Sequence, residues 1–80
     1  LYHILDSRAE ALEFVIREES EVTGIPLMNL NLKNNLLIGC INRGGNIKIA
    51  RGQDCIQQGD TVIVLTSQKG LRDIRDILRK

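Results

Sequence analysis

The sequence holds few side chains of the kinds that carry out covalent chemistry. Its two cysteines, Cys40 and Cys55, lie far along the chain from its one histidine, His3. A Cys-His nucleophile pair would therefore require the fold to bring His3 against one of the thiols. Because the cysteines also lack the C-x-x-C spacing of redox and zinc sites, we interpret both as free thiols packed in aliphatic strands.

Charged residues form two groups of opposite sign. Residues 1–21 contain six acids and two bases, whereas residues 33–51 contain four bases and no acid. The polar run at residues 18–21 could hold a divalent cation through its carboxylates, although a solvated acidic run is the simpler interpretation. The two groups could pair within one chain or across a dimer.

The basic group surrounds two consecutive glycines. Arg43, Lys48 and Arg51 place three cations near Gly44 and Gly45. Successive backbone N–H groups can cradle an anion, but no G-x-G-x-x-G or P-loop is present, and Gly-Gly favours a hairpin turn. Solvated charge is the simpler interpretation of the cations. In a dimer they could instead face an anionic effector or a neighbour's acidic segment, so Arg43 and Arg51 are candidate effector-binding residues.

Basic residues recur at the end of the chain, as Arg72, Arg75, Arg79 and Lys80. Such a face can bind a membrane or a nucleic acid. Two aspartates lie among these residues and no aromatic side chain is there to stack bases, so an exposed helix face is favoured. The near balance of 11 basic and 10 acidic residues also argues against a dedicated nucleic-acid binder.

The length limits what can position these groups. A chain of 80 residues forms one domain, and a composition that is 42% hydrophobic but only 2% aromatic predicts an aliphatic core. A domain of this size buries only roughly 60–65% of the surface that its unfolded chain exposes, so we expect help from a partner chain. No segment approaches the roughly 20 apolar residues that cross a bilayer and no signal peptide opens the chain, so we expect a cytosolic domain.

The hydrophobic pattern predicts four strands. Alternation over residues 11–17 is typical of a strand with one wet face, and the nearly continuous apolar run at residues 36–41 is typical of a central strand covered on both faces. A tight hairpin at residues 43–46 leads into the next strand, and Gly39 marks a bend. The β-branched run at residues 61–66 forms the last strand.

Helices are predicted between and around these strands. Residues 1–10 have helix-like character, and Pro26 suits the start of one or two turns within residues 25–32. Thr66 or Ser67 can cap a closing helix whose apolar residues recur at three- and four-residue spacing. The sequence thus predicts an α+β domain: a four-stranded, mostly antiparallel sheet with a short connecting helix and a C-terminal amphipathic helix.

An ordered set of short motifs resembles one known family. The set comprises residues 8–14, Gly24-Ile25-Pro26-Leu27 leading to Leu30, Leu37-Ile38 through Ile41, Arg43-Gly44-Gly45, Ala50-Arg51-Gly52, Gly59-Asp60 and Val62-Ile63-Val64. Together these motifs resemble the C-terminal regulatory domain of TrkA-type potassium uptake proteins, also called the C-terminal subdomain of regulators of potassium conductance. The resemblance covers residues 8–79.

This resemblance implies an architecture and a set of partners. Residues 1–10 would be a linker from a missing N-terminal nucleotide-binding domain, and residues 11–80 the TrkA C-terminal-like regulatory domain, which pairs into a homodimer. The complete protein would be a cytoplasmic ring, peripheral to the cell membrane through a potassium transporter that it gates. Nicotinamide or adenine nucleotide is expected only in the missing domain, so no cofactor and no metal are expected in this one.

The resemblance leaves the effector open. Some family members bind cyclic di-AMP between two such domains through an Asp, an Arg and an Asn-Ile, but this chain has no Arg within residues 18–42 and no Asp within residues 7–53. Asn34 and Asn35 offer side-chain polarity in that stretch and join the candidate effector-binding residues. The effector could be another small nucleotide or a cation.

The leading hypothesis is therefore a non-catalytic regulatory and dimerisation domain of a potassium uptake system, in which effector or partner binding changes gating. A small-ligand enzyme or redox module using a free cysteine is an alternative from another class. A thiolate that titrates well below the ordinary range would favour that enzyme. A purely structural oligomerisation module is the third hypothesis, and it predicts that no ligand changes the thermal midpoint.

Overall fold

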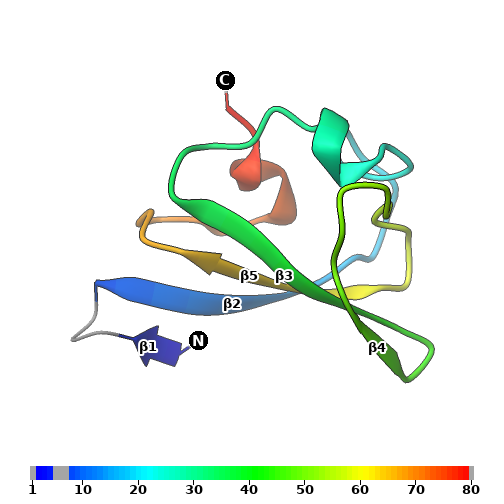
Figure 1. Ribbon diagram of the computed structural model, residues 1–80, viewed down its shortest axis with the longest axis horizontal. Coiled ribbons are helices and arrows are strands. Elements are labelled where there is room, and N and C mark those ends of the chain that lie inside the picture. The colour runs from blue at the N-terminus through cyan, green and yellow to red at the C-terminus, as the bar shows by residue number, and fades with distance from the viewer. Residues whose placement is uncertain (1, 5–7, 80) are drawn as a thin grey trace.

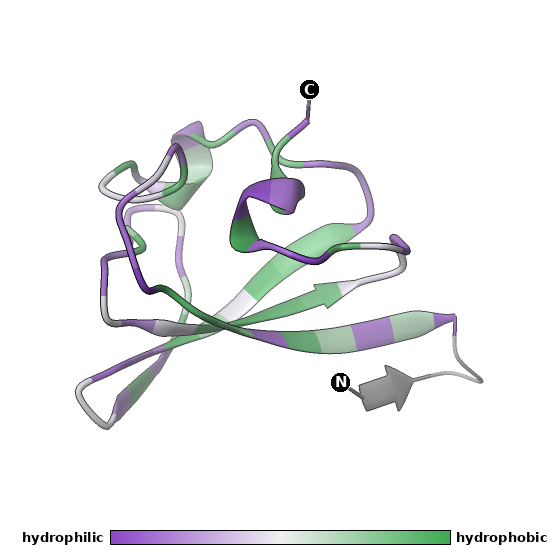
Figure 2. Ribbon diagram, turned by 180° about the vertical axis from the view of Figure 1, so that it is seen from behind, coloured by the Kyte–Doolittle hydropathy of each residue, from purple (hydrophilic) through white to green (hydrophobic). Residues whose placement is uncertain are grey.

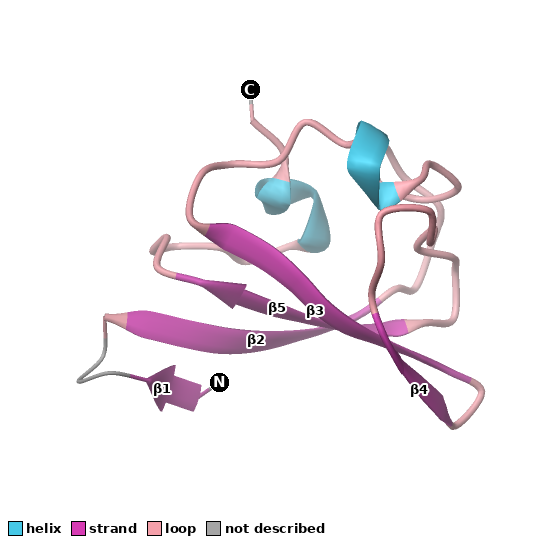
Figure 3. Ribbon diagram, in the orientation of Figure 1, coloured by secondary structure: helices cyan, strands magenta, loops and turns pink. Residues whose placement is uncertain are grey.

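The chain forms one five-stranded antiparallel sheet in the order β1-β2-β5-β3-β4. The computed structural model describes residues 2–4 and 8–79. The strands are β1 (Tyr2–Ile4), β2 (Ala9–Val15), β3 (Leu36–Arg43), β4 (Asn46–Ile49) and β5 (Thr61–Thr66). Two short 3₁₀ helices, η1 (Leu27–Asn29) and η2 (Ile74–Ile77), lie with the long connections on one side of the sheet (Figures 1 and 3).

The four predicted strands are confirmed as β2 to β5. The alternation that predicted β2 is visible as bands of hydrophobic and hydrophilic colour in Figure 2. Gly44 and Gly45 have φ angles of 59° and 88°, the left-handed backbone that a two-residue hairpin turn requires. The predicted bend at Gly39 is also present, because the register of β3 against β5 shifts between Ile38 and Cys40.

The centre of the sheet differs from the prediction. β5, not β3, is the central strand, with β2 on one side and β3 on the other. Nor is β3 covered on both faces: Ile38 and Ile41 are buried, whereas Leu37 is 60% exposed. The continuous apolar run of β3 therefore belongs to a strand that has one face in the core. Its other face is also apolar, but no described element covers it.

The predicted helix-like character of residues 1–10 is wrong where the structure describes them. Tyr2–Ile4 pair antiparallel with β2, with Tyr2 opposite Ala11, and β2 itself begins at Ala9. Backbone hydrogen bonding across the sheet overrides the helical propensity of the alanines. Leu1 and residues 5–7 lie outside the described residues, and the assignment of residues 1–10 as a linker stays a prediction.

The predicted helices are not supported either. The segment after Pro26 makes a single 3₁₀ turn, and the expected closing helix is reduced to η2. Thr66 does not cap a helix, because it is buried within β5 and donates its hydroxyl to the carbonyl of Asn35 at 3.0 Å. With so little helix, the α+β assignment is replaced by a sheet covered on one face by loops and two short turns.

Competing hydrogen bonds explain the loss of the last helix. The carboxylate of Asp76 accepts the backbone N–H groups of Arg72 at 2.9 Å and Asp73 at 3.0 Å, a capping-box arrangement that fixes the start of η2. Beyond it, the carbonyl of Ile77 accepts the N–H of Lys33 at 2.8 Å. The chain after η2 is therefore extended alongside residues 31–33 instead of continuing as a helix.

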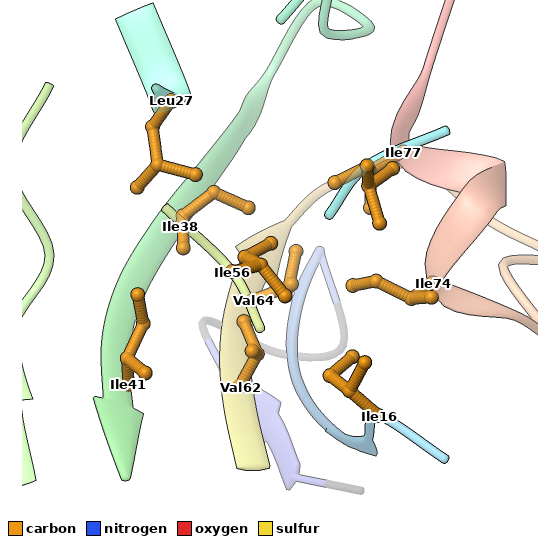
Figure 4. Packing of buried hydrophobic residues seen from close by; sticks show 10 residues of the cluster. Ile16, Leu27, Ile38, Ile41, Ile56, Val62, Val64, Ile74 and Ile77 are labelled. Atoms are coloured by element: carbon orange, nitrogen blue, oxygen red, sulfur yellow. The ribbon is translucent and has the colours of Figure 1, made fainter. Parts of the chain in front are cut away.

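The core lies between the sheet and its covering layer. Figure 4 shows its aliphatic side chains, which come from β3, β5, η1 and η2 and from connecting segments that contribute Ile16 and Ile56. The buried hydrophobic residues are Ile16, Val22, Leu27, Ile38, Ile41, Ile56, Val62, Val64, Ile74 and Ile77. Two of the apolar residues expected in the closing helix, Ile74 and Ile77, thus reach the core without a regular helix. No helix in the described part of the chain is long and apolar enough to span a membrane.

Candidate functional site

An apolar groove lies where η1 meets β3 and the loop that follows β4. Its walls include Leu27 and Met28 of η1, Leu36 and Leu37 of β3, and residues 50–52, and its volume is about 200 Å³. Apolar walls with a few polar groups at the rim are typical of small-molecule sites. We call this feature the β3 groove.

Backbone hydrogen bonds hold the two sides of the β3 groove together. The N–H of Leu27 donates to the carbonyl of Asp54 at 2.8 Å, and the N–H of Met28 donates to the carbonyl of Gly52 at 2.9 Å. Leu27 is buried and anchors η1 in the core, whereas Met28 is 67% exposed at the groove. A Cβ atom at Gly52 would lie 3.2 Å from the Cβ of Met28, so glycine permits this close approach.

Arg51 is the predicted site residue that lines the β3 groove. Its backbone N–H donates to the Asp54 carboxylate at 2.7 Å, while its side chain is exposed and takes part in none of the ion pairs between described residues. Asp54 is instead paired with Lys48 at 2.9 Å, and this hydrogen bond, with that of Arg51, lowers the pKa of Asp54. Arg51 is therefore an exposed cation at the β3 groove, outside the ion pairs between described residues.

Arg43 is bound within the chain. Its Nε and Nη2 donate to the two carboxylate oxygens of Asp60 at 2.9 and 2.8 Å, and Nη2 also donates to the carbonyl of Cys55 at 2.8 Å. Asp60 is 1% exposed and also accepts the N–H of Gln57 at 2.8 Å. The Arg43 hydrogen bonds, with that of Gln57, hold the pKa of Asp60 below its ordinary value although burial opposes them. This geometry makes Arg43 a clamp between the β3–β4 hairpin and the loop before β5.

Asn34 and Asn35 lie at the opposite end of β3 from Arg43. Asn35 has a left-handed φ of 58°, and its carbonyl accepts the N–H of Ser67 at 3.1 Å. The carbonyl of Asn34 accepts the side-chain amide of Gln68 at 2.8 Å. A strand rises roughly 3.3 Å per residue, so about 25 Å separate Asn35 from Arg43 along β3. The four predicted residues do not meet at one point, and only Arg51 lines the β3 groove.

Sequence reasoning missed the partners of the basic residues. The ion pairs of Arg43 and Lys48 go to Asp60 and Asp54, not to the acidic segment at the start of the chain. Asp60 and Arg43 are separated by 17 residues, and no local pattern connects them. Met28 is exposed, and nothing in the sequence distinguishes it from its buried neighbour Leu27.

Other groups with possible chemistry do not form a comparable site. Cys40 and Cys55 are free and partly buried, and the His3 side chain lies outside the described residues. Within the described part of the chain, no three His, Cys, Asp or Glu side chains gather to hold a metal ion. Two larger depressions, of about 380 and 340 Å³, have walls that mix opposite charges or are mostly polar, so the β3 groove is the better candidate for a ligand with an apolar part.

Comparison with known proteins assigns the chain to a family. The model of the TrkA-C domain matches residues 11–79. A Trk system potassium uptake protein TrkA homolog of Pyrococcus abyssi is 34% identical over 73 residues, which are 90% of this chain and 32% of that protein. The TrkA protein of Haemophilus influenzae is 34% identical over 64 residues, 76% of this chain and 14% of its own length. The chain thus spans about a third or less of these relatives.

A solved structure shows the same fold. It is described as "Structure of RCK domain with cda" and superimposes with a TM-score of 0.62 at 22% sequence identity, covering 74% of this chain and 81% of the other. The predicted resemblance is confirmed by the family match and by the relatives, whose shared name is that of a potassium uptake protein. The chain belongs to the TrkA-C domain family.

Proposed function

We propose that this chain is a regulatory domain of a potassium uptake system and that it acts by reversible binding, without catalysis. The support is its membership of the TrkA-C family and the names of its relatives, which are potassium uptake proteins. In this proposal the domain forms a homodimer, and residues 1–10 link it to a nucleotide-binding domain. The complete protein associates with a membrane potassium transporter at the cytoplasmic face, and any nicotinamide or adenine nucleotide cofactor binds outside these 80 residues.

The β3 groove is the site at which an effector acts. The observation that carries this is an exposed guanidinium, that of Arg51, beside the apolar side chains of Met28 and Leu37. Such a surface suits a small anionic molecule with a flat apolar part, such as a nucleotide: phosphate lies beside Arg51 and the base packs on the aliphatic wall.

The size of the groove accounts for the need for a second subunit. Its volume of about 200 Å³ lies below the roughly 300–1,000 Å³ usual for small-molecule sites. One copy of the domain therefore covers only part of a nucleotide, and a second copy completes the site. A ligand held between two copies favours the arrangement that fits it best, and this difference in affinity is what shifts the attached transporter between states.

Thermal unfolding in the presence of nucleotides and divalent cations tests this function. A ligand at 100 times its dissociation constant stabilises the folded state by about 2.7 kcal/mol, which raises the midpoint of a domain this small by roughly 10–20 °C. Arg51→Glu should remove the shift for an anionic ligand. Arg17→Glu is the matched control, because Arg17 is also exposed and lies outside the β3 groove.

Two results would count against the proposal. If no nucleotide or cation raises the midpoint, the domain is a structural oligomerisation module. If a ligand raises it equally in the wild type and in Arg51→Glu, the β3 groove is not the binding site.

A further inference from the structure

The strand β4 is an uncovered edge of the sheet. It is last in the strand order, and all four of its residues are exposed. Ile47 and Ile49 are 70% and 73% exposed, the highest values for large apolar side chains in the described part of the chain. Isolated exposed apolar residues are ordinary, but two on one free strand edge are typical of a surface that binds another strand.

The backbone of these two isoleucines points toward the free edge. Arg43 and Asn46 flank the two-residue turn as a pair, and the N–H of Ala50 donates to the carbonyl of Gly39 at 3.0 Å. Hydrogen-bonding direction alternates along a strand, so Asn46, Lys48 and Ala50 bond toward β3. Ile47 and Ile49 therefore direct their N–H and C=O groups away from the sheet, toward any strand that approaches.

The charge on β4 does not protect this edge. A lysine is a common device against pairing of exposed strands. Lys48, however, is opposite the buried Ile41 and extends to the side of the sheet that carries the core, where Asp54 binds it at 2.9 Å. The face that bears Ile47 and Ile49 consequently has no charge within β4.

We propose that β4 is the seam of the homodimer, where it pairs antiparallel with β4 of a second copy about a two-fold axis at Lys48. Ile47 then lies opposite Ile49 of the partner subunit, and each such pair exchanges two backbone hydrogen bonds. The two five-stranded sheets become one continuous sheet across the seam. This inference deepens the proposed function and rests on its homodimer.

The local sequence favours a second copy over a foreign strand. The segment from Ile47 to Ile49 is an isoleucine, a lysine and an isoleucine, so two antiparallel copies place isoleucine against isoleucine on one face. On the other face the axis brings the two Lys48 side chains together. Their repulsion is offset because each is paired with its own Asp54, which puts two acids beside two bases.

This seam also explains how a second copy would complete the β3 groove. With Lys48 on the axis, Asn46 of the partner subunit lies opposite Ala50. The partner's hairpin turn then extends beyond Ala50, toward Arg51 and Gly52 at the groove. Formation of the seam and closure of the effector site are thereby coupled, so that a ligand in the groove should tighten the dimer.

Cross-linking of the whole 80-residue chain tests the register. In a Cys40→Ser/Cys55→Ser background, Lys48→Cys should form an intermolecular disulfide under mild oxidation. The Cα atoms of such a non-hydrogen-bonded antiparallel pair lie about 4.5 Å apart, within disulfide range. Gln58→Cys is the matched control, exposed but away from β4, and should stay reduced at the same protein concentration.

Sedimentation of Ile49→Pro tests the seam independently. Proline is tolerated on an edge strand where the N–H faces outward, so this variant should keep the wild-type circular dichroism and sediment as a monomer. Val15→Thr, at an exposed position on β2, should remain dimeric. If Ile49→Pro fails to fold, the double variant Ile47→Thr/Ile49→Thr replaces it and should weaken the dimer by at least about tenfold, about 1.4 kcal/mol.

The possible failures are distinguishable. A wild-type dimer that survives Ile49→Pro and does not cross-link through Lys48→Cys overturns the seam but leaves the homodimer of the proposed function intact. A wild-type chain that is monomeric at every concentration overturns both the homodimer and its seam. The shift of the thermal midpoint on adding a ligand still tests the effector site by itself.

Discussion

Arg43→Ala should destabilise the domain strongly, because the Arg43 guanidinium neutralises the buried carboxylate of Asp60. In the wild type, the guanidinium donates two hydrogen bonds to Asp60 and a third to the carbonyl of Cys55. After the substitution the Asp60 carboxylate, which is 1% exposed, keeps the N–H of Gln57 as its hydrogen-bond donor. A charge is then left buried without its partner.

The size of the loss follows from the exposure of the two partners. Removing one member of a fully buried ion pair costs about 3–5 kcal/mol, whereas exposed pairs contribute about 1 kcal/mol or less. The Arg43 side chain is 43% exposed, so water compensates for part of the loss and we expect about 2–3 kcal/mol. For a domain whose total stability is roughly 4–12 kcal/mol, this is a large fraction.

Urea unfolding at fixed protein concentration measures this difference. Arg51→Ala is the matched control: it removes the same charge from an exposed side chain outside the ion pairs between described residues, and should change stability by less than about 0.5 kcal/mol. In the background of Arg43→Ala, Asp60→Asn should cost less than it does alone, since the pair is already broken. Equal small losses for Arg43→Ala and Arg51→Ala would refute the clamp.

Three further predictions follow from the same geometry. The pKa of Asp60 is lowered in the folded state, so the stability that its carboxylate contributes is present above about pH 4 and is lost as the pH falls through the folded pKa. In urea unfolding at a series of pH values, Asp60→Asn should therefore reduce the loss of stability toward acid pH. Gly44→Ala, at a φ of 59°, should cost about 1 kcal/mol, whereas Gly39→Ala should be nearly neutral because its added Cβ would meet the Ile63 carbonyl at an ordinary 3.5 Å; equal thermal midpoints would contradict this. Ile77→Ala should cost about 3 kcal/mol in urea unfolding because the side chain is fully buried, and a cost below 1 kcal/mol would show that η2 does not close the core.

The parts of the fold that local chemistry decides could be predicted from the sequence. Gly44-Gly45 between two apolar runs specified the hairpin, and the β-branched run at residues 61–66 specified β5. Gly39 also indicated the bulge, because a glycine within an apolar strand has no side chain to pack and often marks a break in the strand's register. These signals are short-range and do not depend on what packs against them.

The errors arose where distant contacts decide the structure. The closing segment carries apolar residues at helical spacing, but after η2 its backbone pairs with residues 31–33 instead of continuing as a helix. Distant contacts also decide the surroundings of the candidate effector-binding residues: Arg43 is hydrogen-bonded to Asp60, which lies 17 residues away in the sequence and which no local pattern indicates. Arg51, unlike Arg43, forms no ion pair with a described residue, because the neighbouring Asp54 carboxylate pairs with Lys48.

Potassium uptake in cells tests most directly whether this domain regulates transport through the β3 groove. Cells that lack their own TrkA would express a TrkA-type protein carrying this domain, with Arg51→Glu or the control Arg17→Glu, at equal protein levels. Arg51→Glu should change uptake by at least about fivefold while Arg17→Glu leaves it as in the wild type. Equal uptake for the wild type and both variants would contradict a regulatory role for the groove.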